Sequence, residues 1–201
     1  MTSFVSGDST IGDYPLSQES PLVTRNSDGG LNIDTRNPVM GSVMGVNLTS
    51  EGGGDDNIFT SDASDIVDAG VGDDIVFAGG DADFVFGADG NDIIRGGDGD
   101  DVIRGGKGAD VLIGGSGSDT FLIRGEDLDG STDAILDFDQ SEEDVLILQE
   151  IPLQGVGEVS YDSDSGDVIL TDDSGASVIA NLPTDLDITV IDQGDGNWTL
   201  L

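Results

Sequence analysis

Residues 96–122 read GGDGDDVIR GGKGADVLI GGSGSDTFL, three consecutive nine-residue units of the form G-G-x-G-x-D-x-U-x, where U is a large apolar residue. The same frame, extended back to residue 51, gives eight units without a gap. Every unit has aspartate at its sixth position and a large apolar residue at its eighth. The apolar residues are Ile58, Val67, Val76, Val85, Ile94, Ile103, Leu112 and Phe121. Because internal repeats of this kind indicate a solenoid, the repeat decides the fold class.

The last three residues of a unit, such as Val102, Ile103 and Arg104, predict a short strand with one side chain pointing inward. The six preceding residues, rich in glycine and aspartate, predict a turn. Two units then complete one coil, and each unit stacks on the unit two further along, at the inter-strand spacing of about 4.8 Å. We therefore predict an all-β fold, a right-handed parallel β-roll (solenoid), over residues 51–122.

Stacking also places the sixth-position aspartates in two rows, one along each edge of the roll. Two carboxylates about 4.8 Å apart repel by roughly 3 kcal/mol at an effective dielectric constant near 20. A divalent cation between successive coils reverses the sign of this interaction, and carbonyl oxygens of the turns complete its shell. Calcium suits such a site better than magnesium, which demands near-ideal octahedral geometry. We expect several Ca²⁺ ions, whose binding free energy is also folding free energy.

The composition excludes several classes of function. The chain has 42 Asp and Glu against 6 Lys and Arg, a formal net charge of −36, and it contains neither histidine nor cysteine. Disulfides, Cys- or His-based zinc sites, thiol nucleophiles and His-dependent catalysis are thereby excluded. Nucleic acid and anionic membranes are poor partners, because both require a basic surface. Abundant aspartate and glycine favour tight turns with oxygen ligands, although a disordered acidic chain has a similar composition.

The flanks divide the chain into three parts. We predict an irregular N-terminal segment at 1–50, the roll at 51–122, and a β-rich C-terminal cap at 123–201. Short strands are expected in the cap at 158–161, 167–170, 177–181, 187–191 and 197–201. The run DSDSGD at 162–167 is read as a hairpin turn, because it lacks the spacing of an EF-hand loop. The start of the chain has neither a basic nor an apolar signal region, and no apolar run is long enough to span a bilayer.

The repeats resemble those of the RTX (repeats-in-toxin) family of secreted, hemolysin-type calcium-binding proteins. The resemblance implies that each ion takes the second- and fourth-position carbonyls and the sixth-position Asp of one unit. The unit two further on supplies its first- and third-position carbonyls and its own Asp. The resemblance also implies an extracellular location reached by type I secretion, which would explain the missing N-terminal signal.

Carried onto this chain, the family pattern predicts four regular sites. They join Gly97, Gly99 and Asp101 to Gly114, Ser116 and Asp119; Ala88, Gly90 and Asp92 to Gly105, Lys107 and Asp110; Gly79, Asp81 and Asp83 to Gly96, Asp98 and Asp101; and Gly70, Gly72 and Asp74 to Gly87, Asp89 and Asp92.

Three further sites depart from the pattern. The site joining Ser61, Ala63 and Asp65 to Ala78, Gly80 and Asp83 is expected to be weakest or empty, because Ala adopts a left-handed backbone poorly. The site from Gly52, Gly54 and Asp56 to Ala69, Val71 and Asp74 should be intermediate. After the repeats, Asp137 and Asp144 either cap a last ion held by Gly115, Gly117 and Asp119, or belong to an ordinary acidic strand–turn–strand.

The outward-facing seventh and ninth positions carry apolar residues on both sheets. One sheet has Phe59, Ile75, Phe77 and Ile93, and the other has Ile66, Phe84, Phe86 and Val102. Exposed apolar ladders usually mark a covered surface. We expect residues 1–50 or 123–201 to pack over them; self-association or docking on a partner is the alternative.

These observations predict a secreted calcium-binding protein that is disordered at low calcium and folds outside the cell. Its role is then a structural, adhesive or matrix component of the cell exterior that self-assembles. The alternative is a stand-alone calcium-loaded effector or carrier whose flanking regions bind a specific target. An enzyme is not expected, because the histidine of the RTX protease and lipase chemistries is missing.

Overall fold

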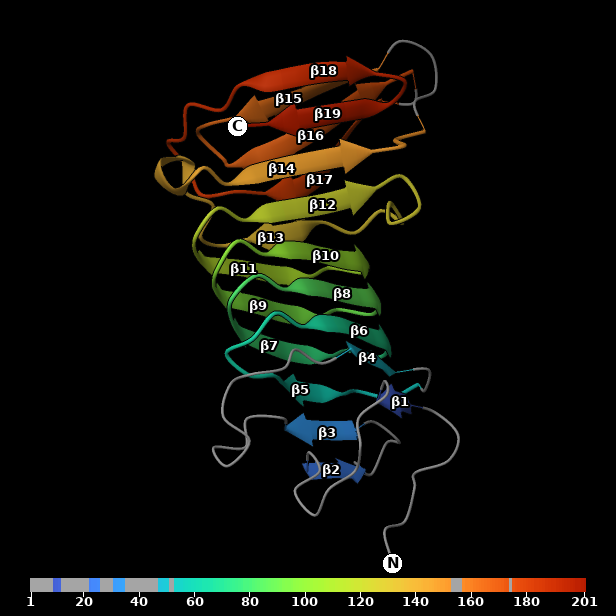
Figure 1. Cartoon of the computed structure of the whole chain (residues 1–201). Helices are drawn as coiled ribbons and strands as arrows, with labels where there is room; N and C mark the ends of the chain where they lie inside the picture. Colours follow the sequence, from blue (N-terminus) through green and yellow to red (C-terminus); the bar gives the residue numbers. More distant parts are fainter. Residues whose placement is uncertain are drawn as a thin grey trace, which may run out of the picture.

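The computed structural model describes residues 9–11, 22–25, 31–34, 47–50, 53–152, 157–173 and 175–201. Within these ranges the chain is almost entirely β-structure, with one short 3₁₀-helix, η1 (Gln140–Glu142). The strands form two sheets that face each other along a tall, flattened stack (Figure 1). No helix among the described residues is long and apolar enough to cross a bilayer.

The first sheet has nine strands. In spatial order they are β1 (Ser9–Ile11), β4 (Asn47–Ser50), β6 (Ile66–Val71), β8 (Phe84–Asp89), β10 (Val102–Lys107), β12 (Thr120–Arg124), β14 (Val145–Gln149), β19 (Asn197–Leu200) and β18 (Val190–Gly194).

The second sheet has ten strands. In spatial order they are β15 (Glu158–Asp162), β16 (Asp167–Asp172), β17 (Gly175–Asn181), β13 (Asp133–Ile135), β11 (Val111–Ser116), β9 (Ile93–Asp98), β7 (Ile75–Gly80), β5 (Asn57–Phe59), β3 (Leu31–Asp34) and β2 (Leu22–Arg25).

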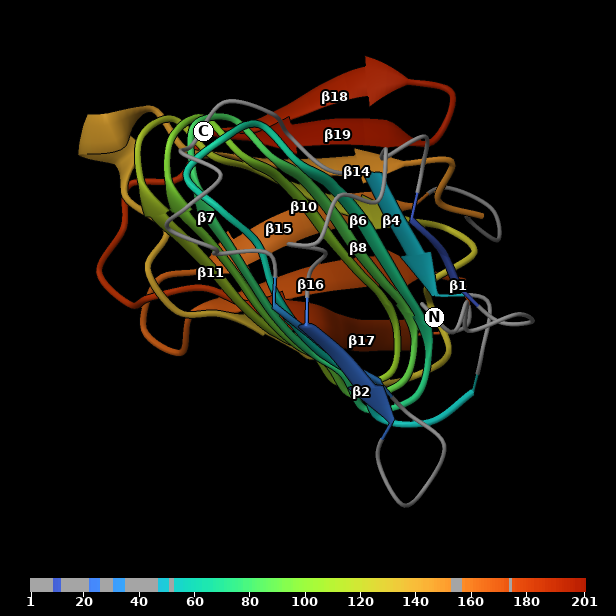
Figure 2. The same cartoon turned by 60° about the horizontal axis from the view of Figure 1, so that its bottom comes forward.

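The repeat units stack as the sequence predicts. Val85 lies opposite Ile103 in the first sheet, and Val76 lies opposite Ile94 in the second, so each unit pairs in parallel with the unit two further along. Successive units alternate between the sheets, and the coils superimpose when viewed along the stack (Figure 2). The predicted parallel β-roll is confirmed.

The strands are longer than the three residues that the sequence predicts. Strands β6 to β11 have six residues each, because pairing continues into the second and third positions of the following unit. Gly106 pairs with Ala88 and Lys107 with Asp89, whereas Gly105, at a first position, is skipped. Because equivalent turns stack directly on one another, their backbones also pair and lengthen the strands. The pairing is interrupted at the first position, beside which the aspartate side chain lies.

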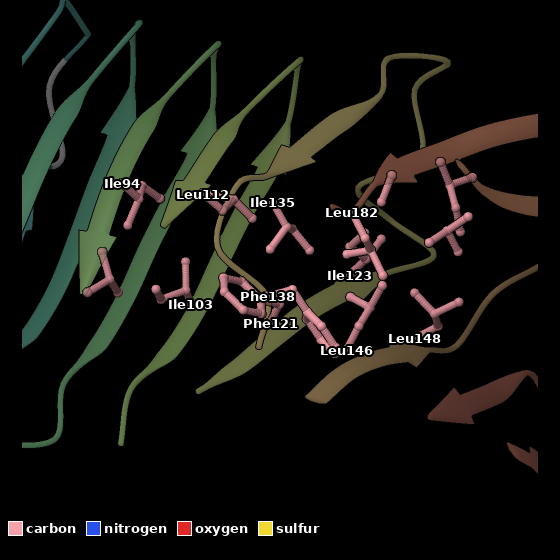
Figure 3. Close-up of a cluster of buried hydrophobic side chains, with 14 of the residues drawn as sticks. Ile94, Ile103, Leu112, Phe121, Ile123, Ile135, Phe138, Leu146, Leu148 and Leu182 are labelled. Carbon is pink, nitrogen blue, oxygen red and sulfur yellow. The ribbon is translucent and has the colours of Figure 1, made fainter. Parts of the chain in front are cut away.

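The eighth-position residues form the core between the sheets, as predicted. Ile58, Val67, Val76, Val85, Ile94, Ile103, Leu112 and Phe121 are all 0% exposed. Figure 3 shows this file of side chains continuing past Phe121 into Ile135, Phe138, Leu146 and Leu148. Burial of an aliphatic or aromatic side chain stabilises a fold by roughly 1.5–3 kcal/mol, so the file supplies a continuous hydrophobic contribution along the roll.

The parallel stack extends beyond residues 51–122 at both ends. Ile135 of β13 lies opposite Leu112, and Leu146 of β14 lies opposite Phe121. At the other end, β3 pairs in parallel with β5, and β4 pairs in parallel with β6. Four short strands therefore lie within residues 1–50, where the sequence predicts irregular structure. Strand β17 pairs in parallel with β13. Antiparallel strands then end the stack: β1 and β2 at one end, and β18–β19 and β15–β16 at the other.

The C-terminal cap is β-rich, as predicted. Strands β15, β16, β17 and β19 cover the expected segments, whereas β18 begins at Val190 rather than at residue 187. The acidic run 162–167 joins β15 to β16, whose ends Asp162 and Asp167 pair antiparallel. This run is the hairpin turn that the sequence predicts, not an EF-hand loop.

Candidate metal centre

The sixth-position aspartates lie in two buried rows. Asp56, Asp74, Asp92 and Asp110 form one row, and Asp65, Asp83, Asp101 and Asp119 form the other; none is more than 3% exposed. Buried carboxylates are rare unless they are paired or coordinate a metal. The predicted alignment of the aspartates is therefore present, and it places an acidic residue under each interval between coils.

In six of these eight carboxylates, one oxygen accepts a hydrogen bond from the backbone N–H of the aspartate in the preceding coil. The N–H of Asp83 donates to Oδ1 of Asp101 at 2.8 Å, and that of Asp92 donates to Oδ1 of Asp110 at 2.8 Å. The same bond recurs along both rows at an aspartate-to-aspartate separation of 18 residues. It fixes the orientation of each of these carboxylates and aims the second oxygen in one direction.

The second oxygen has no hydrogen-bond partner in six of these aspartates. They are Asp74, Asp83, Asp92, Asp101, Asp110 and Asp119, and in each the buried Oδ2 is unsatisfied. Burial is the main cause of a raised pKa in all six: about 8 for Asp92, about 7 for Asp74, Asp83 and Asp119, and about 6 for Asp101 and Asp110. The ionised carboxylates thus lack a counter-charge in the protein itself.

In Asp92, Asp101, Asp110 and Asp119 the unpartnered Oδ2 lies against the first-position glycine of its own unit, whereas the units of Asp74 and Asp83 have alanine at that position. A Cβ built on Gly96 would overlap Oδ2 of Asp101 and would lie 2.8 Å from the carbonyl oxygen of Gly114. A Cβ on Gly87 would likewise overlap Oδ2 of Asp92, 2.6 Å from the carbonyl oxygen of Gly105. The space of one methyl group therefore separates a carboxylate oxygen of one coil from a carbonyl oxygen of the next.

The second- and fourth-position carbonyls also face the interval between coils. Those of Gly97 and Gly99 are directed at Gly115 and Gly117 of the coil above, where a Cβ would overlap them. Gly97 and Gly99 have φ values of 128° and 136°, in the left-handed region that favours glycine. The turn glycines thus aim two carbonyl oxygens into the same interval as the aspartate.

The third-position carbonyls accept one backbone hydrogen bond each. Gly99 N–H donates to the carbonyl of Ser116 at 2.7 Å, and Gly90 N–H donates to that of Lys107 at 2.8 Å. A carbonyl oxygen has two lone pairs, so one remains for a further ligand. The oxygens of Gly97, Gly99, Asp101, Gly114 and Ser116 therefore border one interval, as the resemblance implies.

The donor set fits calcium. It consists only of carboxylate and carbonyl oxygens, the ligands that Ca²⁺ prefers, and the unsatisfied Oδ2 atoms supply the negative charge. Nowhere in the described part of the chain do three or more acidic side chains alone form a metal-binding group. The sites therefore depend on turn carbonyls as much as on aspartates. A turn whose second and fourth positions lack the left-handed φ no longer directs those two carbonyl oxygens at the metal site.

The second unit departs from the others, as the sequence predicts. Ser61 and Ala63 lack the positive φ that the described second and fourth positions of every other unit adopt, including Asp81 and Ala88 with φ of 59° and 86°. Moreover, Oδ2 of Asp65 accepts a bond from Ser61 N–H at 3.3 Å, so it is partnered. These contacts support the prediction that the site from Ser61, Ala63 and Asp65 to Ala78, Gly80 and Asp83 is the weakest.

The first unit is described only from Gly53 onward, so the predicted ligand Gly52 lies outside the described residues. Gly54 has the left-handed φ of 124°, and its carbonyl faces Gly72 of the coil above. The intermediate strength of the site between Asp56 and Asp74 stays a prediction.

The structure brings Asp137 and Asp144 to the end of the row that contains Asp119. Asp119 N–H donates to Oδ1 of Asp144 at 2.9 Å, which is the bond that links aspartates throughout the row. Asp137 accepts bonds from the N–H groups of Gly114 and Gly115, each at 2.9 Å. Their charges also raise the pKa of Asp119. This arrangement favours the capping interpretation over an ordinary acidic turn.

Sequence reasoning missed Asp133, which continues the other row. Asp110 N–H donates to its Oδ1 at 3.1 Å. Asp133 could have been recognised from its spacing alone, although the turn glycines are absent. It precedes the buried Ile135 by two residues, as Asp144 precedes the buried Leu146.

Comparison with known proteins agrees with this geometry. Residues 52–85 and 86–121 match the family described as RTX calcium-binding nonapeptide repeat (4 copies). Among solved structures, the chain is similar to the solution structure of the AlgE6R3 subunit of the Azotobacter vinelandii mannuronan C5-epimerase. The identity is 30% and the TM-score 0.36, over 52% of this chain and 67% of that chain. No curated protein matches the chain.

The fold and the rows of aspartates and turn carbonyls define a calcium-binding β-roll protein. The chain belongs to the family of RTX nonapeptide-repeat proteins. Calcium is its cofactor, and the number of repeats accommodates several ions.

The methyl-sized space beside Gly96 provides a test of the predicted ligands. Gly96→Ala should weaken calcium binding at least about tenfold, or about 1.4 kcal/mol, because its Cβ displaces Asp101 and Gly114. Gly53→Ala is the matched control: neither glycine has a left-handed φ, and at Gly53 the nearest atom is 4.0 Å from a Cβ. The measurement is a calorimetric calcium titration, and equal affinities for both variants would contradict the assignment.

The raised pKa values predict opposite pH dependences with and without calcium. A buried Asp whose pKa is raised from 3.8 stabilises the calcium-free roll below that value, and the contribution is lost as pH rises through about 6 to 8. In calcium-free buffer, strand content measured by circular dichroism should therefore be greater at about pH 5 than at about pH 8. Calcium affinity should instead fall with acidification, because protons compete for the same oxygens. A calcium-free roll that gains structure with rising pH would show that these carboxylates are not buried as described.

Proposed function

We propose that calcium drives the folding of this protein outside the cell, where the folded roll serves as a structural or adhesive component. The observation that carries the first part is the set of six buried, unsatisfied Oδ2 atoms. An uncompensated buried charge costs several kcal/mol, and here the cost recurs along both rows. A divalent cation in each interval removes it, so the folded state is favoured only when calcium is present.

The affinity range typical of extracellular calcium modules supports the proposed extracellular location. Extracellular calcium modules bind with dissociation constants of roughly 10⁻⁴ to 10⁻³ M, well above cytoplasmic calcium. A chain that is unfolded before export and folds on arrival suits type I secretion, which is typical of the family. The net charge of −36 also keeps the unfolded chain soluble.

The structural or adhesive role is supported by the outer faces of the roll. Ile66, Phe77, Phe84 and Ile93 are 38–48% exposed and Val71 is 56% exposed, all within the first five repeat units. Phe77 stacks on Phe59 with ring centroids 5.3 Å apart, so part of the face is a rigid aromatic ladder. The C-terminal cap lies at the end of the stack, not over these faces (Figure 1). Ile66 and Phe84 lie on the outer face of the first sheet, and Phe77 and Ile93 on that of the second, so each face offers apolar side chains for lateral contact with a second copy.

A hollow of about 430 Å³ favours the second candidate, an effector or carrier that binds a specific target. Its lining includes Phe86 together with the charged residues Asp68, Asp89, Arg104 and Lys107. Charges of both signs beside an aromatic side chain suit a small polar ligand or a peptide end better than a repeated contact between copies of the chain. In either role we propose no catalysis by this chain, which has no histidine.

Removal of calcium tests the first part of the proposal. Far-UV circular dichroism should show little strand signal in chelator and a cooperative gain during a calcium titration in the range of roughly 10⁻⁴ to 10⁻³ M. Magnesium at the same concentration is the control and should give no comparable gain. A full strand signal in chelator would overturn calcium-driven folding.

Sedimentation velocity separates the two roles. If the outer faces drive assembly, the wild type should form large species in calcium but not in chelator, and Phe84→Ser should reduce them several-fold. Ile191→Ser removes an exposed apolar side chain from β18 of the cap, away from the repeat units, and should leave assembly unchanged. A protein that remains monomeric in calcium would favour the effector or carrier role instead.

A further inference from the structure

The outer face of the first sheet carries the hollow of about 430 Å³, which lies over β6, β8 and β10, three neighbouring strands (Figure 1). Asp68, Phe86 and Arg104 line it side by side, because these ninth-position residues lie opposite one another in the register of the sheet. Ala88 and Gly106 also line it, and they contribute a methyl group or no side chain at all. Their left-handed φ values of 86° and 117° belong to the turns of the repeat, so the geometry that builds the roll also leaves space on its surface.

The basic side chains of the hollow are already bound to acidic ones. Arg104 donates from Nε and Nη2 to the two carboxylate oxygens of Asp127, at 3.0 and 2.5 Å, and from Nη2 to Glu126 at 2.7 Å. Lys107 pairs with Asp89 at 3.0 Å. An anionic ligand would therefore compete with carboxylates of the protein for both cations.

One acidic side chain of the hollow has no such partner. Asp68 is the only charged residue of the lining that makes no hydrogen bond or ion pair within the described part of the chain. It is half-buried, and burial raises the pKa of its carboxyl. A partly desolvated carboxylate without a counter-charge is stabilised by a cation that enters the hollow.

The neighbour of this carboxylate is aromatic. Asp68 lies opposite Phe86 on the adjacent strand, and adjacent strands are about 4.8 Å apart, so both side chains border the same part of the hollow. A cation near the face of an aromatic ring is attracted by the ring, and an ammonium group also donates N–H bonds to a carboxylate. The pair therefore matches an organic ammonium group.

A bare metal ion matches the hollow less well. Calcium takes about six to eight oxygen ligands, and the other carboxylates of the lining are bound to Arg104 or Lys107. A phenyl ring contributes no oxygen ligand, whereas it favours an ammonium group and the methylene groups attached to it.

We propose that the hollow binds an alkylammonium group, held by the carboxylate of Asp68 and the ring of Phe86. Ligand pockets begin at about 300 Å³, so the hollow also has room for the alkyl chain. The group belongs to a free small amine or to a lysine side chain of a peptide, which present the same chemistry. The proposal names the ligand of the effector or carrier role, and it rests on calcium-driven folding because three coils of the roll build the hollow.

Titration of the calcium-loaded protein with n-butylammonium tests the proposal, with n-butanol as the neutral probe of the same chain length. Affinities are measured by calorimetry, and the ligand protons are observed by NMR. The wild type should bind n-butylammonium at least about tenfold more tightly than n-butanol, because only the ammonium group pairs with a carboxylate. The methylene protons beside the nitrogen should shift upfield on binding, because they lie near the face of the ring.

Three variants locate the ammonium group. Asp68→Asn should weaken n-butylammonium binding at least about tenfold, and Phe86→Leu should weaken it about threefold and remove the upfield shift. Asp164→Asn, in the exposed turn between β15 and β16, removes the same charge far from the hollow and should keep the wild-type affinity. Equal losses in Asp68→Asn and Asp164→Asn would show attraction to the net charge alone and overturn the site.

The remaining outcomes identify the source of the group and separate this proposal from the function on which it rests. A blocked peptide with one central lysine that binds more tightly than n-butylammonium supports a peptide ligand, whereas binding of the free amine alone supports a small amine. A wild type that shows the strand signal in calcium but binds neither probe overturns the ammonium site and leaves calcium-driven folding intact. A wild type without the strand signal in calcium overturns both.

Discussion

The structure depends on a buried aspartate with one oxygen tied to the backbone and the other left open. The tie fixes the distance and direction of the carboxylate relative to the preceding coil, as in the bond from Asp83 N–H to Asp101. The open oxygen then requires a small first-position residue, which is Gly96 in the same unit. The apolar eighth position keeps the coils together while these charges oppose one another. The sixth position thus supplies the buried charge, the first position leaves room for its open oxygen, and the eighth position supplies the apolar contacts that offset the repulsion.

Because interior carboxylates are shared between intervals, the coils are coupled to their neighbours. Asp92 donates its N–H to Asp110 and accepts at Oδ1 from Asp74, so it belongs to the interval below and to the interval above. Solenoids behave as one-dimensional chains in which each repeat contacts only its neighbours. The second unit is the weak element of this chain, since Asp65 already accepts a bond from Ser61. Cooperative folding should therefore be strongest in the C-terminal half of the roll.

The sequence predicts those features that each unit repeats in phase: the parallel stack, the core from Ile58 to Phe121, and the two rows of aspartates. It does not predict the continuation of the roll, because residues 123–127 shift the frame and residues 128–136, which contain Asp133 and Ile135, lack the turn glycines of the repeat. Asp133 was recognisable only by its spacing from Ile135. The strands β3 and β4 have no repeat pattern in their sequences. They join the stack by pairing in parallel with it, with Ile33 opposite Ile58 and Leu48 opposite Val67. The six-residue length of β6 to β11 arises because the turns of successive coils pair with each other, and the sequence of a single unit does not show this pairing.

The antiparallel strands at the two ends have a consequence for growth of the roll. A stack of like coils exposes at each end a parallel edge that could accept another coil from another molecule, without limit. Here β2 and β1 pair antiparallel with β3 and β4, and β19 pairs antiparallel with β14. In the second sheet β17 continues the parallel pairing at β13, and β16 and β15 then add antiparallel strands. A like coil added along the stack would therefore meet an antiparallel edge strand, not the parallel edge that the repeat units form.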